Sequence, residues 1–346
     1  MSGPDIIVIG GSAGSIQPLK TIINGLPGFL PAAVFVVVHL PAEYPSLLPE
    51  ILQRETELRV GFAQSGEKLC AGHVYVAPPD QHLELGKDRL RLHHGPRENR
   101  HRPAIDVLFR TAARSHGKQV TGVLLSGILD DGAAGIWAVQ QAGGLTIVQD
   151  PQDAAHPDMP LAALEWIRPD RVLPAAKIDV QIAAWAANGR SSEHGAESSA
   201  QESEHAMASQ ENIEAESDAR ISGRPSPIAC PECHGVLWEV ESLPKPMFRC
   251  RVGHSYSLET LNCELSLATE GALWASLRIL SEKAAIIDRM ASRESGPRLR
   301  YLNEQLETFN QHIETLKQVI TNLNMRQPRK TQRRPPAEAE KPEGTE

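Results

Sequence analysis

The sequence has few cysteines, no surplus of basic residues and no long hydrophobic run. Its longest apolar stretch, residues 32–40, is far shorter than a bilayer-spanning helix and contains His39, so we expect no membrane insertion. No basic segment precedes the first apolar residues, which argues against a secretory signal peptide. A net charge of −8 argues against non-specific binding of nucleic acid. Three of the five cysteines fall within residues 230–250, which favours a metal site in the reducing cytoplasm over disulfide bonds.

Composition divides the chain into five parts. The first, residues 1–187, alternates short β-branched runs with helix-like stretches. The parts after the first are a linker (188–224), a cysteine module (225–257), a helical segment (258–325) and a tail (326–346). The linker is rich in Ser and Glu, and the tail is rich in Pro and charged residues. We expect both to be disordered, because neither can bury enough apolar surface.

Most strand-like runs in the first part are uninterrupted and apolar, which indicates strands covered on both faces. These runs are Asp5–Ile9, Ala33–Val38, Arg59–Phe62, His73–Ala77, Gly122–Leu125 and Leu145–Val148. Helical patterns alternate with them at Ile16–Asn24, Leu47–Glu55, Ile105–His116 and Gly132–Ala142. The alternation predicts an α/β fold with a doubly wound, mostly parallel sheet. Residues 83–93 alternate around a Gly-Lys-Asp turn and predict an antiparallel hairpin at the edge.

Polar residues follow three of these runs. Ser12 lies in the glycine-rich turn after the first run, His39 follows the second, and Asp130 and Asp131 follow the run ending at Leu125. Because the carboxyl ends of parallel strands meet at one edge of a sheet, we expect the serine, the histidine and one or both aspartates to converge there.

A serine, an imidazole and a carboxylate together form a nucleophile, a general base and an orienting group. Backbone N–H groups at the helix that follows Ser12 would face a developing oxyanion. Two alternatives remain at this level. The glycine-rich turn could cradle a phosphate, although it matches neither G-x-G-x-x-G nor a Walker sequence and has no lysine. Asp131 could simply cap the helix that follows it.

The first part resembles the catalytic domain of chemotaxis-type protein-glutamate methylesterases, the CheB family, over about residues 5–185. The blocks that carry the resemblance, all in family order, are IIVIGGSAGSIQPLK, VVVHLP, HVYVAPPDQHLEL, RPAIDVLFRTAA, GVLLSGILDDGAAGIWAVQQAGG and VQDPQDAAHPDMPLAAL. The resemblance implies a serine hydrolase that removes methyl esters from glutamates of a methylated, chemoreceptor-like protein, with glutamine deamidation as a further activity, and that needs no catalytic cofactor.

The resemblance also assigns roles to residues. It makes Ser12 the nucleophile, His39 the general base and acid, and Asp131 the orienting carboxylate. Backbone N–H groups of Ala13 and Ile128 would serve the oxyanion. Asp130 stands where the family commonly has asparagine, and it is interpreted only as a neighbour.

Two departures from the family pattern bear on substrate and regulation. The usual Ser-Thr-Gly-Gly is here Ser12-Ala13-Gly14-Ser15, which removes a hydroxyl beside the nucleophile. The first strand begins at once, so we expect a standalone form without an amino-terminal receiver domain, which puts phosphorylation control and the receptor substrate in doubt.

The cysteine module carries two pairs of metal ligands with knuckle-like spacing. Cys230 and Cys233 form the first pair, and Cys250 and His254 form the second. Four filled positions predict a structural Zn²⁺ site in a small zinc-ribbon-like module, with short strands VLWEV and MFRC flanking the knuckles. Basic and acidic residues balance there, which favours contact with protein over nucleic acid.

Apolar residues in the helical segment step by three and four, as in an a/d seam. Ser295-Gly296-Pro297 separates two such runs. The pattern predicts a helical hairpin or, as an alternative, helices that pair with a second copy in a homodimer.

Two functions therefore remain open for the whole chain. The first is a serine esterase acting on a partner protein. The second is a non-catalytic signalling adaptor that binds partners through its metal module and helices. Joint presence of Ser12, His39 and Asp131 favours the enzyme.

Overall fold

The structure is a computed structural model that describes residues 5–40, 46–188, 223–240 and 243–326. The predicted disordered linker and tail lie outside these ranges apart from their end residues. The chain divides into two compact units, residues 1–262 and residues 263–346. No described helix is both long enough and apolar enough to cross a membrane.

A seven-stranded parallel sheet forms the centre of the first unit, in the order β3-β4-β2-β1-β7-β8-β9. Its strands are β1 (Asp5–Gly11), β2 (Ala32–Val38), β3 (Arg59–Phe62), β4 (His73–Val76), β7 (Val120–Leu124), β8 (Leu145–Gln149) and β9 (Arg171–Leu173). The predicted doubly wound parallel sheet is confirmed. From β1 the chain runs through β2 to the edge strand β3, then places β4 between β3 and β2, and later returns to β7 on the other side of β1.

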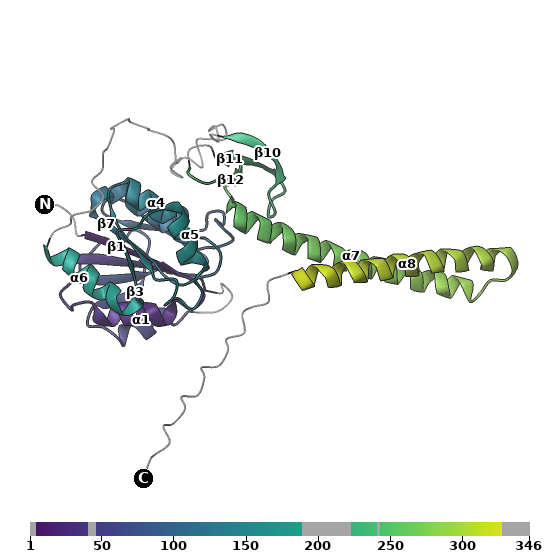
Figure 1. The fold of residues 1–346 in the computed structure, drawn as a ribbon, viewed down its shortest axis with the longest axis horizontal. Coiled ribbons are helices and arrows are strands. Elements are labelled where there is room, and N and C mark those ends of the chain that lie inside the picture. The colour runs from purple at the N-terminus through teal and green to yellow at the C-terminus, as the bar shows by residue number, and fades with distance from the viewer. Residues whose placement is uncertain (1–4, 41–45, 189–222, 241–242, 327–346) are drawn as a thin grey trace, which may run out of the picture. The chain divides into compact units, whose positions relative to one another are not determined.

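Helices cover both faces of this sheet (Figure 1). One face packs against α1 (Ile16–Gly25), α2 (Leu48–Gln53) and α6 (Ile178–Asn188), and the other packs against α3 (Ile105–His116), α4 (Ala133–Gln141) and α5 (Asp158–Trp166). Successive side chains of β1 alternate between the two cores, with Ile6 and Val8 in one and Ile7 and Ile9 in the other. The uninterrupted apolar runs of the sequence follow from this double burial. Short 3₁₀ turns lie at Gly117–Gln119 and Ala175–Lys177.

The predicted hairpin is present as β5 (His82–Leu85) and β6 (Leu90–His93), and it forms a two-stranded sheet of its own. Leu83, Leu85 and Leu90 are buried in the core beneath α3. The segment between β6 and α3, residues 94–104, therefore starts close to that core and leads toward the edge of the main sheet where the predicted site lies.

The cysteine module is a four-stranded antiparallel sheet within the first unit. Its strands are β10 (Arg224–Ala229), β11 (Val236–Val240), β12 (Met247–Cys250) and β13 (Ser255–Ser257), and they include both strands predicted here. Among the described residues, its buried core consists of Leu237, Phe248, Tyr256, Leu261 and two cysteines, with Ile228 and a third cysteine packed against it. So small a core favours a module that depends on a bound metal for stability.

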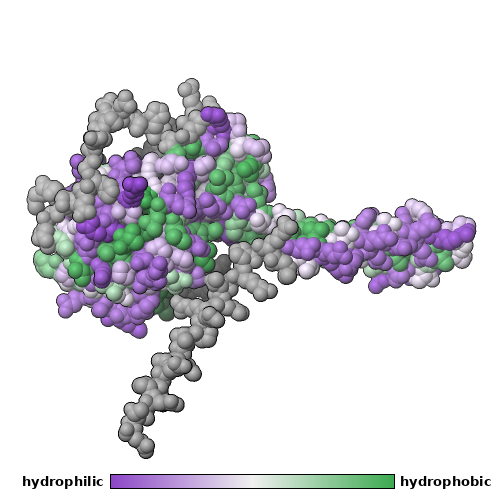
Figure 2. Space-filling view, viewed as in Figure 1, coloured by the Kyte–Doolittle hydropathy of each residue, from purple (hydrophilic) through white to green (hydrophobic). Residues whose placement is uncertain are grey.

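Two long helices, α7 (Leu258–Ala291) and α8 (Gly296–Arg326), follow the module. Within the second unit, Ile287 and Ala291 of α7 pack against Leu302 of α8, and Lys283 lies over the ring of Phe309. These contacts form the predicted intramolecular hairpin. Apolar side chains such as Trp274 and Ile286 stay exposed, and Figure 2 shows hydrophobic patches on the otherwise hydrophilic surface of these helices.

Candidate active site

Ser12 lies in the tight turn between β1 and α1, at the carboxyl edge of the sheet. Its N–H donates to the carbonyl of Ser126 at 2.9 Å, and its carbonyl accepts from both N–H and Oγ of Ser15, at 3.1 and 2.7 Å. Gly14 in this turn has φ +76, a left-handed conformation that favours glycine. The turn is therefore fixed on both sides of a half-buried Ser12.

His39 follows β2, the strand beside β1. In the parallel register Gly11 pairs with Val38, and the His39 N–H donates to the Gly11 carbonyl at 3.2 Å. Ser12 and His39 are therefore the next residues on two adjacent strands, which run about 4.8 Å apart in a sheet. The His39 side chain is only 6% exposed.

Asp131 lies in the segment between β7 and α4 and contacts the His39 ring. Its Oδ2 lies 2.8 Å from His39 Nε2. Since a carboxylate only accepts, the ring proton belongs on Nε2, and Nδ1 keeps its lone pair. Nδ1 is buried and has no hydrogen-bond partner among the described residues. The structure thus brings all three predicted residues to one edge and leaves one imidazole nitrogen free to take a proton.

The start of α3 binds the Asp131 carboxylate from the other side. The N–H groups of Ile105 and Asp106 donate to Oδ2 and Oδ1, at 2.7 and 3.3 Å. Burial alone would raise the pKa of Asp131, but the hydrogen bond and charge of His39, and then His101 and Ile105, lower it to about 2. The carboxylate is therefore ionised at neutral pH, as an orienting group must be.

A second histidine, which the sequence did not single out, stacks on the first. The rings of His101 and His39 are 3.4 Å apart between centroids and 7° from parallel. Burial, followed by the charge of His39, lowers the pKa of His101 to about 3. His101 is therefore neutral at physiological pH and acts as a flat wall for the His39 ring.

The backbone groups predicted to bind an oxyanion flank Ser12. Within the described chain, the N–H groups of Ala13 and Ile128 donate no hydrogen bond. Between them, Ser126 donates from Oγ to the carbonyl of Ala13 at 2.8 Å and so joins the two segments. Met159 packs on Gly127, where a Cβ atom would stand 1.8 Å from its sulfur and 2.9 Å from Ser12 Cβ. Only glycine fits at position 127 beside the nucleophile.

Three further polar residues at this site were not predicted to act there. Asn99 Nδ2 donates to Asp106 Oδ2 at 3.0 Å and to Asp131 Oδ1 at 3.3 Å. Asp106 Oδ1 in turn accepts from the N–H groups of Gly132 and Gly135 at the start of α4, at 3.0 and 2.6 Å. Asp130, interpreted from sequence as a mere neighbour, is 7% exposed and accepts two hydroxyl hydrogen bonds. No local pattern marks these contacts, because their partners come from distant parts of the chain.

The four predicted metal ligands also come together. One ligand atom each from Cys230, Cys233, Cys250 and His254 lies within 4.8 Å of all the others. Cys233 Sγ and Cys250 Sγ are 3.6 Å apart, and His254 Nδ1 is 3.7 and 3.5 Å from the sulfurs of Cys230 and Cys250. Tetrahedral zinc with ordinary bond lengths requires about 3.8 Å between sulfurs and about 3.6 Å from sulfur to nitrogen. The cluster therefore fits a metal ion of this kind.

A carboxylate orients the histidine of this cluster. Glu232 Oε2 lies 3.2 Å from His254 Nε2, so the other ring nitrogen, Nδ1, is the one aimed at the cysteines. Such a partner is typical of histidines that bind a metal.

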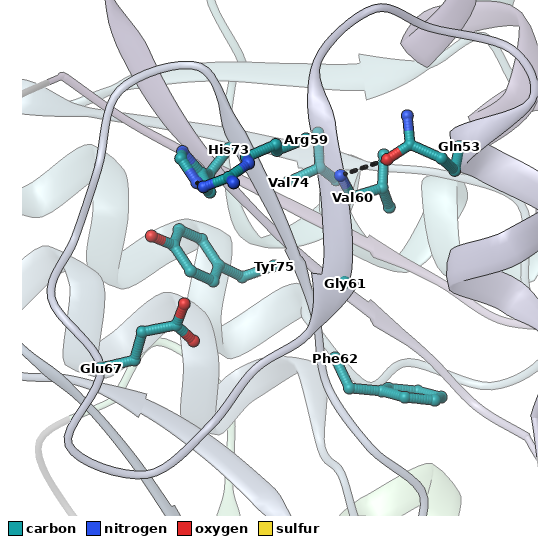
Figure 3. A pocket seen from close by; sticks show the side chains of 9 residues that line it. All are labelled: Gln53, Arg59, Val60, Gly61, Phe62, Glu67, His73, Val74 and Tyr75. Carbon is teal, nitrogen blue, oxygen red and sulfur yellow. Dashed lines mark hydrogen bonds between the residues drawn. The ribbon is translucent and has the colours of Figure 1, made fainter.

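A separate hollow of about 310 Å³ lies along edge strand β3 (Figure 3). Its lining includes Arg59, Glu67, His73 and Tyr75, and Figure 3 shows Gln53 accepting the N–H of Val60 beside it. None of the triad residues lines this hollow, so it is no part of the candidate active site.

The comparisons with known proteins agree with this geometry. Residues 7–182 match the family described as CheB methylesterase. A protein-glutamate methylesterase/protein-glutamine glutaminase of Xanthomonas campestris pv. campestris is 37% identical over 189 residues, which is 54% of this chain and 52% of that protein. One of Salmonella typhimurium with the same activities in its name is 34% identical over 188 residues, 53% of this chain and 54% of that protein.

A solved structure is similar as well. The CheB methylesterase catalytic domain of Thermotoga maritima is 34% identical and superposes with a TM-score of 0.51, covering 53% of this chain and 99% of that one. The chain spans about half the length of the curated relatives it matches. The region matched by the family model includes the glycine-rich turn.

Proposed function

The chain belongs to the CheB methylesterase family, and we propose that it hydrolyses methyl esters of glutamate side chains on a partner protein through Ser12, His39 and Asp131. The observation that carries the proposal is the buried, hydrogen-bonded pair of His39, which follows the strand beside β1, and Asp131, with one imidazole nitrogen left unpartnered among the described residues. Hydrolysis by a Ser-His-Asp triad needs no cofactor.

The proposed reaction begins with proton transfer from Ser12 Oγ to His39 Nδ1 as Oγ attacks the ester carbonyl. Asp131 stabilises the imidazolium that forms, because its carboxylate stays ionised. Collapse of the tetrahedral intermediate breaks the bond to the methoxy oxygen, which leaves as methanol with the proton from His39. Water, deprotonated by His39, then hydrolyses the acyl-serine and regenerates the hydroxyl.

Stabilisation of the oxyanion is assigned to the N–H groups of Ala13 and Ile128. The absence of a hydrogen-bond partner for either group in the described chain supports this assignment. Two such donors in a preorganised position lower the barrier by several kcal/mol.

Glutamine deamidation is a second activity of the same triad. The names of both curated relatives join the two activities, and an amide carbonyl can be attacked as an ester carbonyl is. In that reaction His39 would protonate the amide nitrogen, which leaves as ammonia when the C–N bond breaks. For the substrate, we propose a methylated receptor-like signalling protein. We also propose that the enzyme works in the cytoplasm and has no nucleic-acid partner.

Methanol release from a methylated receptor fragment tests the activity, and fluorophosphonate labelling tests the nucleophile without knowledge of the substrate. We expect both signals to vanish in Ser12→Ala and to stay unchanged in Ser292→Ala, whose exposed hydroxyl bonds only the Arg289 carbonyl. Full hydrolysis by Ser12→Ala would overturn the assigned nucleophile. A loss of both signals in Ser292→Ala would show that the assay does not report on this site.

We also propose that the cysteine module holds one structural Zn²⁺. The residues that would bind it are Cys230, Cys233, Cys250 and His254, with the spacing that tetrahedral coordination requires. Elemental analysis of reduced protein should give about one zinc per chain. The ion would stabilise the module's fold and would take no part in hydrolysis.

A homodimer through the C-terminal helices remains a proposal. Its support is the set of apolar side chains that the hairpin leaves exposed, among them Trp274, Ile279 and Met290. Light scattering after gel filtration would give the mass of a dimer, and a monomer mass at all concentrations would contradict it. The adaptor function, by contrast, gains no support from the buried, hydrogen-bonded pair of His39 and Asp131.

A further inference from the structure

The cysteine module binds the loop that precedes α3 through the main chain of β13. The Asn99 N–H donates to the carbonyl of Ser255 at 2.8 Å, and the Ser255 N–H donates to the carbonyl of Arg97 at 3.4 Å. Glu98 pairs with Ser255 in a parallel bridge. Both partners lie in the first compact unit. In effect, β13 adds the loop at residues 97–99 to the edge of the module's sheet.

The side chain of Asn99 joins this contact to the triad. Its Oδ1 accepts the N–H of Ser257 at 3.0 Å, which fixes the amide so that Nδ2 points toward Asp106 and Asp131. The residue is 2% exposed and has φ +47, a conformation that asparagine tolerates better than most residues. Without the Ser257 donor, the amide would lose the contact that sets its orientation.

The first turn of α7 makes a second link. Ser257 Oγ and Thr260 Oγ1 both donate to Asp130 Oδ1, at 2.9 and 3.1 Å. Ser257 Oγ also accepts the N–H of Thr260 at 3.0 Å, as an N-cap does. Asp130 directly precedes Asp131 in the chain, and Asn99 donates a hydrogen bond to Asp131. Both neighbours of Asp131 are therefore held by one short segment, residues 257–260.

The metal cluster sits at the start of that segment. His254 directly precedes β13, and the Cys250 N–H donates to its carbonyl at 3.0 Å. Since the module has a small apolar core, a bound metal is what would keep His254, and with it β13, in place.

We propose that the metal module is a positioning element of the active site: metal held by Cys230, Cys233, Cys250 and His254 fixes β13 against Asn99, and Asn99 in turn holds Asp131 for catalysis. The inference rests on the proposed hydrolase function. Asn99 is a positioning residue, because it acts on substrate only through Asp131. Replacement of Asn99 should therefore change the turnover rate more than substrate binding.

The test uses the full chain, with and without zinc, and follows the rate of fluorophosphonate labelling at Ser12. Chelation should lower the rate at least about tenfold in the wild type, and added Zn²⁺ should restore it, since small displacements of a catalytic group have effects of this size. In Asn99→Asp, which keeps the shape and suits the backbone but removes the amide donor, the rate should already be low at one zinc per chain. Chelation should then lower it less than about threefold, since the link is already broken.

Two further measurements separate positioning from loss of fold. With a small ester substrate, Asn99→Asp should lower kcat and leave KM unchanged, while the control Asn303→Asp on the exposed face of α8 changes neither. Hydrogen exchange should show residues 97–101 and 255–260 opening on chelation while β1 and β7 stay protected.

Three outcomes overturn the inference. They are labelling that is independent of zinc, labelling that rises on chelation, and an equal effect of chelation in the wild type and Asn99→Asp. In each of these Ser12 is still labelled, so the proposed function stands. If the zinc-loaded wild type shows no labelling at Ser12 and no ester hydrolysis, the proposed function itself fails, and the inference with it.

Discussion

The imidazole rings of His39 and His101 stack face to face, with 3.4 Å between their centroids. The two residues come from different parts of the chain, one at the end of β2 and the other in the loop before α3. His101 stays neutral down to a pH of about 3 because burial lowers its pKa. It can therefore fix the plane of the His39 ring without competing for a proton.

Two replacements of His101 distinguish the effect of its flat ring on activity from the effect of its ring nitrogens. We expect His101→Phe to keep kcat within about threefold, because a flat ring still packs on His39. His101→Ala should lower kcat about tenfold or more, because the His39 ring gains a side on which to move. Steady-state kinetics on one ester substrate measure both. An equal loss in the two variants would mean that a nitrogen of His101, and not its ring, is needed.

The pKa of Asp130 predicts a stability effect that depends on pH. Burial raises this pKa to about 6, against the hydrogen bonds from Ser257 and Thr260 that lower it. An acid whose pKa is higher in the folded than in the unfolded state binds more protons when the protein is folded. The destabilisation by Asp130 is therefore absent at a pH below its pKa in the unfolded chain, and it grows as the pH rises to about 6.

Asp130→Asn should therefore stabilise the protein, since an amide oxygen can still accept from both hydroxyls. The gain in the free energy of unfolding should reach at most about 3 kcal/mol at pH 8 and roughly half of that at pH 5. Denaturant unfolding of both proteins at the two pH values gives the difference. A gain that is the same at both pH values would rule out ionisation of Asp130 as its cause.

Glu232 offers a test of how the metal histidine is oriented. Glu232→Gln should weaken zinc affinity about tenfold or more, because the carboxylate that holds His254 Nε2 is lost. Competition with a chromogenic chelator measures the affinity. Glu239→Gln, an exposed glutamate on β11 of the same module, serves as the control and should leave affinity unchanged.

Gly127 and Met159 form a steric pair beside the nucleophile. A methyl group at position 127 would overlap the sulfur of Met159, so Gly127→Ala should displace Ser12 and lower kcat by about 100-fold. In the double variant with Met159→Ala, the added methyl group has room, so kcat should be at least about tenfold higher than in Gly127→Ala alone. A double-mutant cycle over the two single variants and the double variant measures this coupling. Strict additivity of the two losses would exclude this contact as the reason for the glycine.

The sequence predicts the sheet, and with it the edge at which the three candidate triad residues meet, because the signals of the strands are local. Apolar runs indicate the strands, and parallel strand ends bring Ser12, His39 and Asp131 to one edge. Strand β9 was missed because three residues give no periodic pattern. Spacing alone predicts the four candidate metal ligands, and their ligand atoms lie within 4.8 Å of one another.

The contacts of Asn99 and His101 could not be predicted in the same way. Asn99 lies in an irregular loop with a left-handed backbone, and its partner Ser257 is 158 residues away. No periodicity or spacing links two such positions, since their contact depends on how the cysteine module docks. For the same reason Asp130 was interpreted as a bystander, although it accepts hydroxyls from β13 and α7.

Only the three residues of β13 separate His254, a candidate metal ligand, from the first residue of α7. Side chains alternate along a strand, so one inserted residue between His254 and Leu258 would turn the Ser257 hydroxyl away from Asp130. A shortened chain meant to isolate the hydrolase should therefore end beyond Thr260. One cut after α6 would leave the amide of Asn99 and the carboxylate of Asp130 facing water.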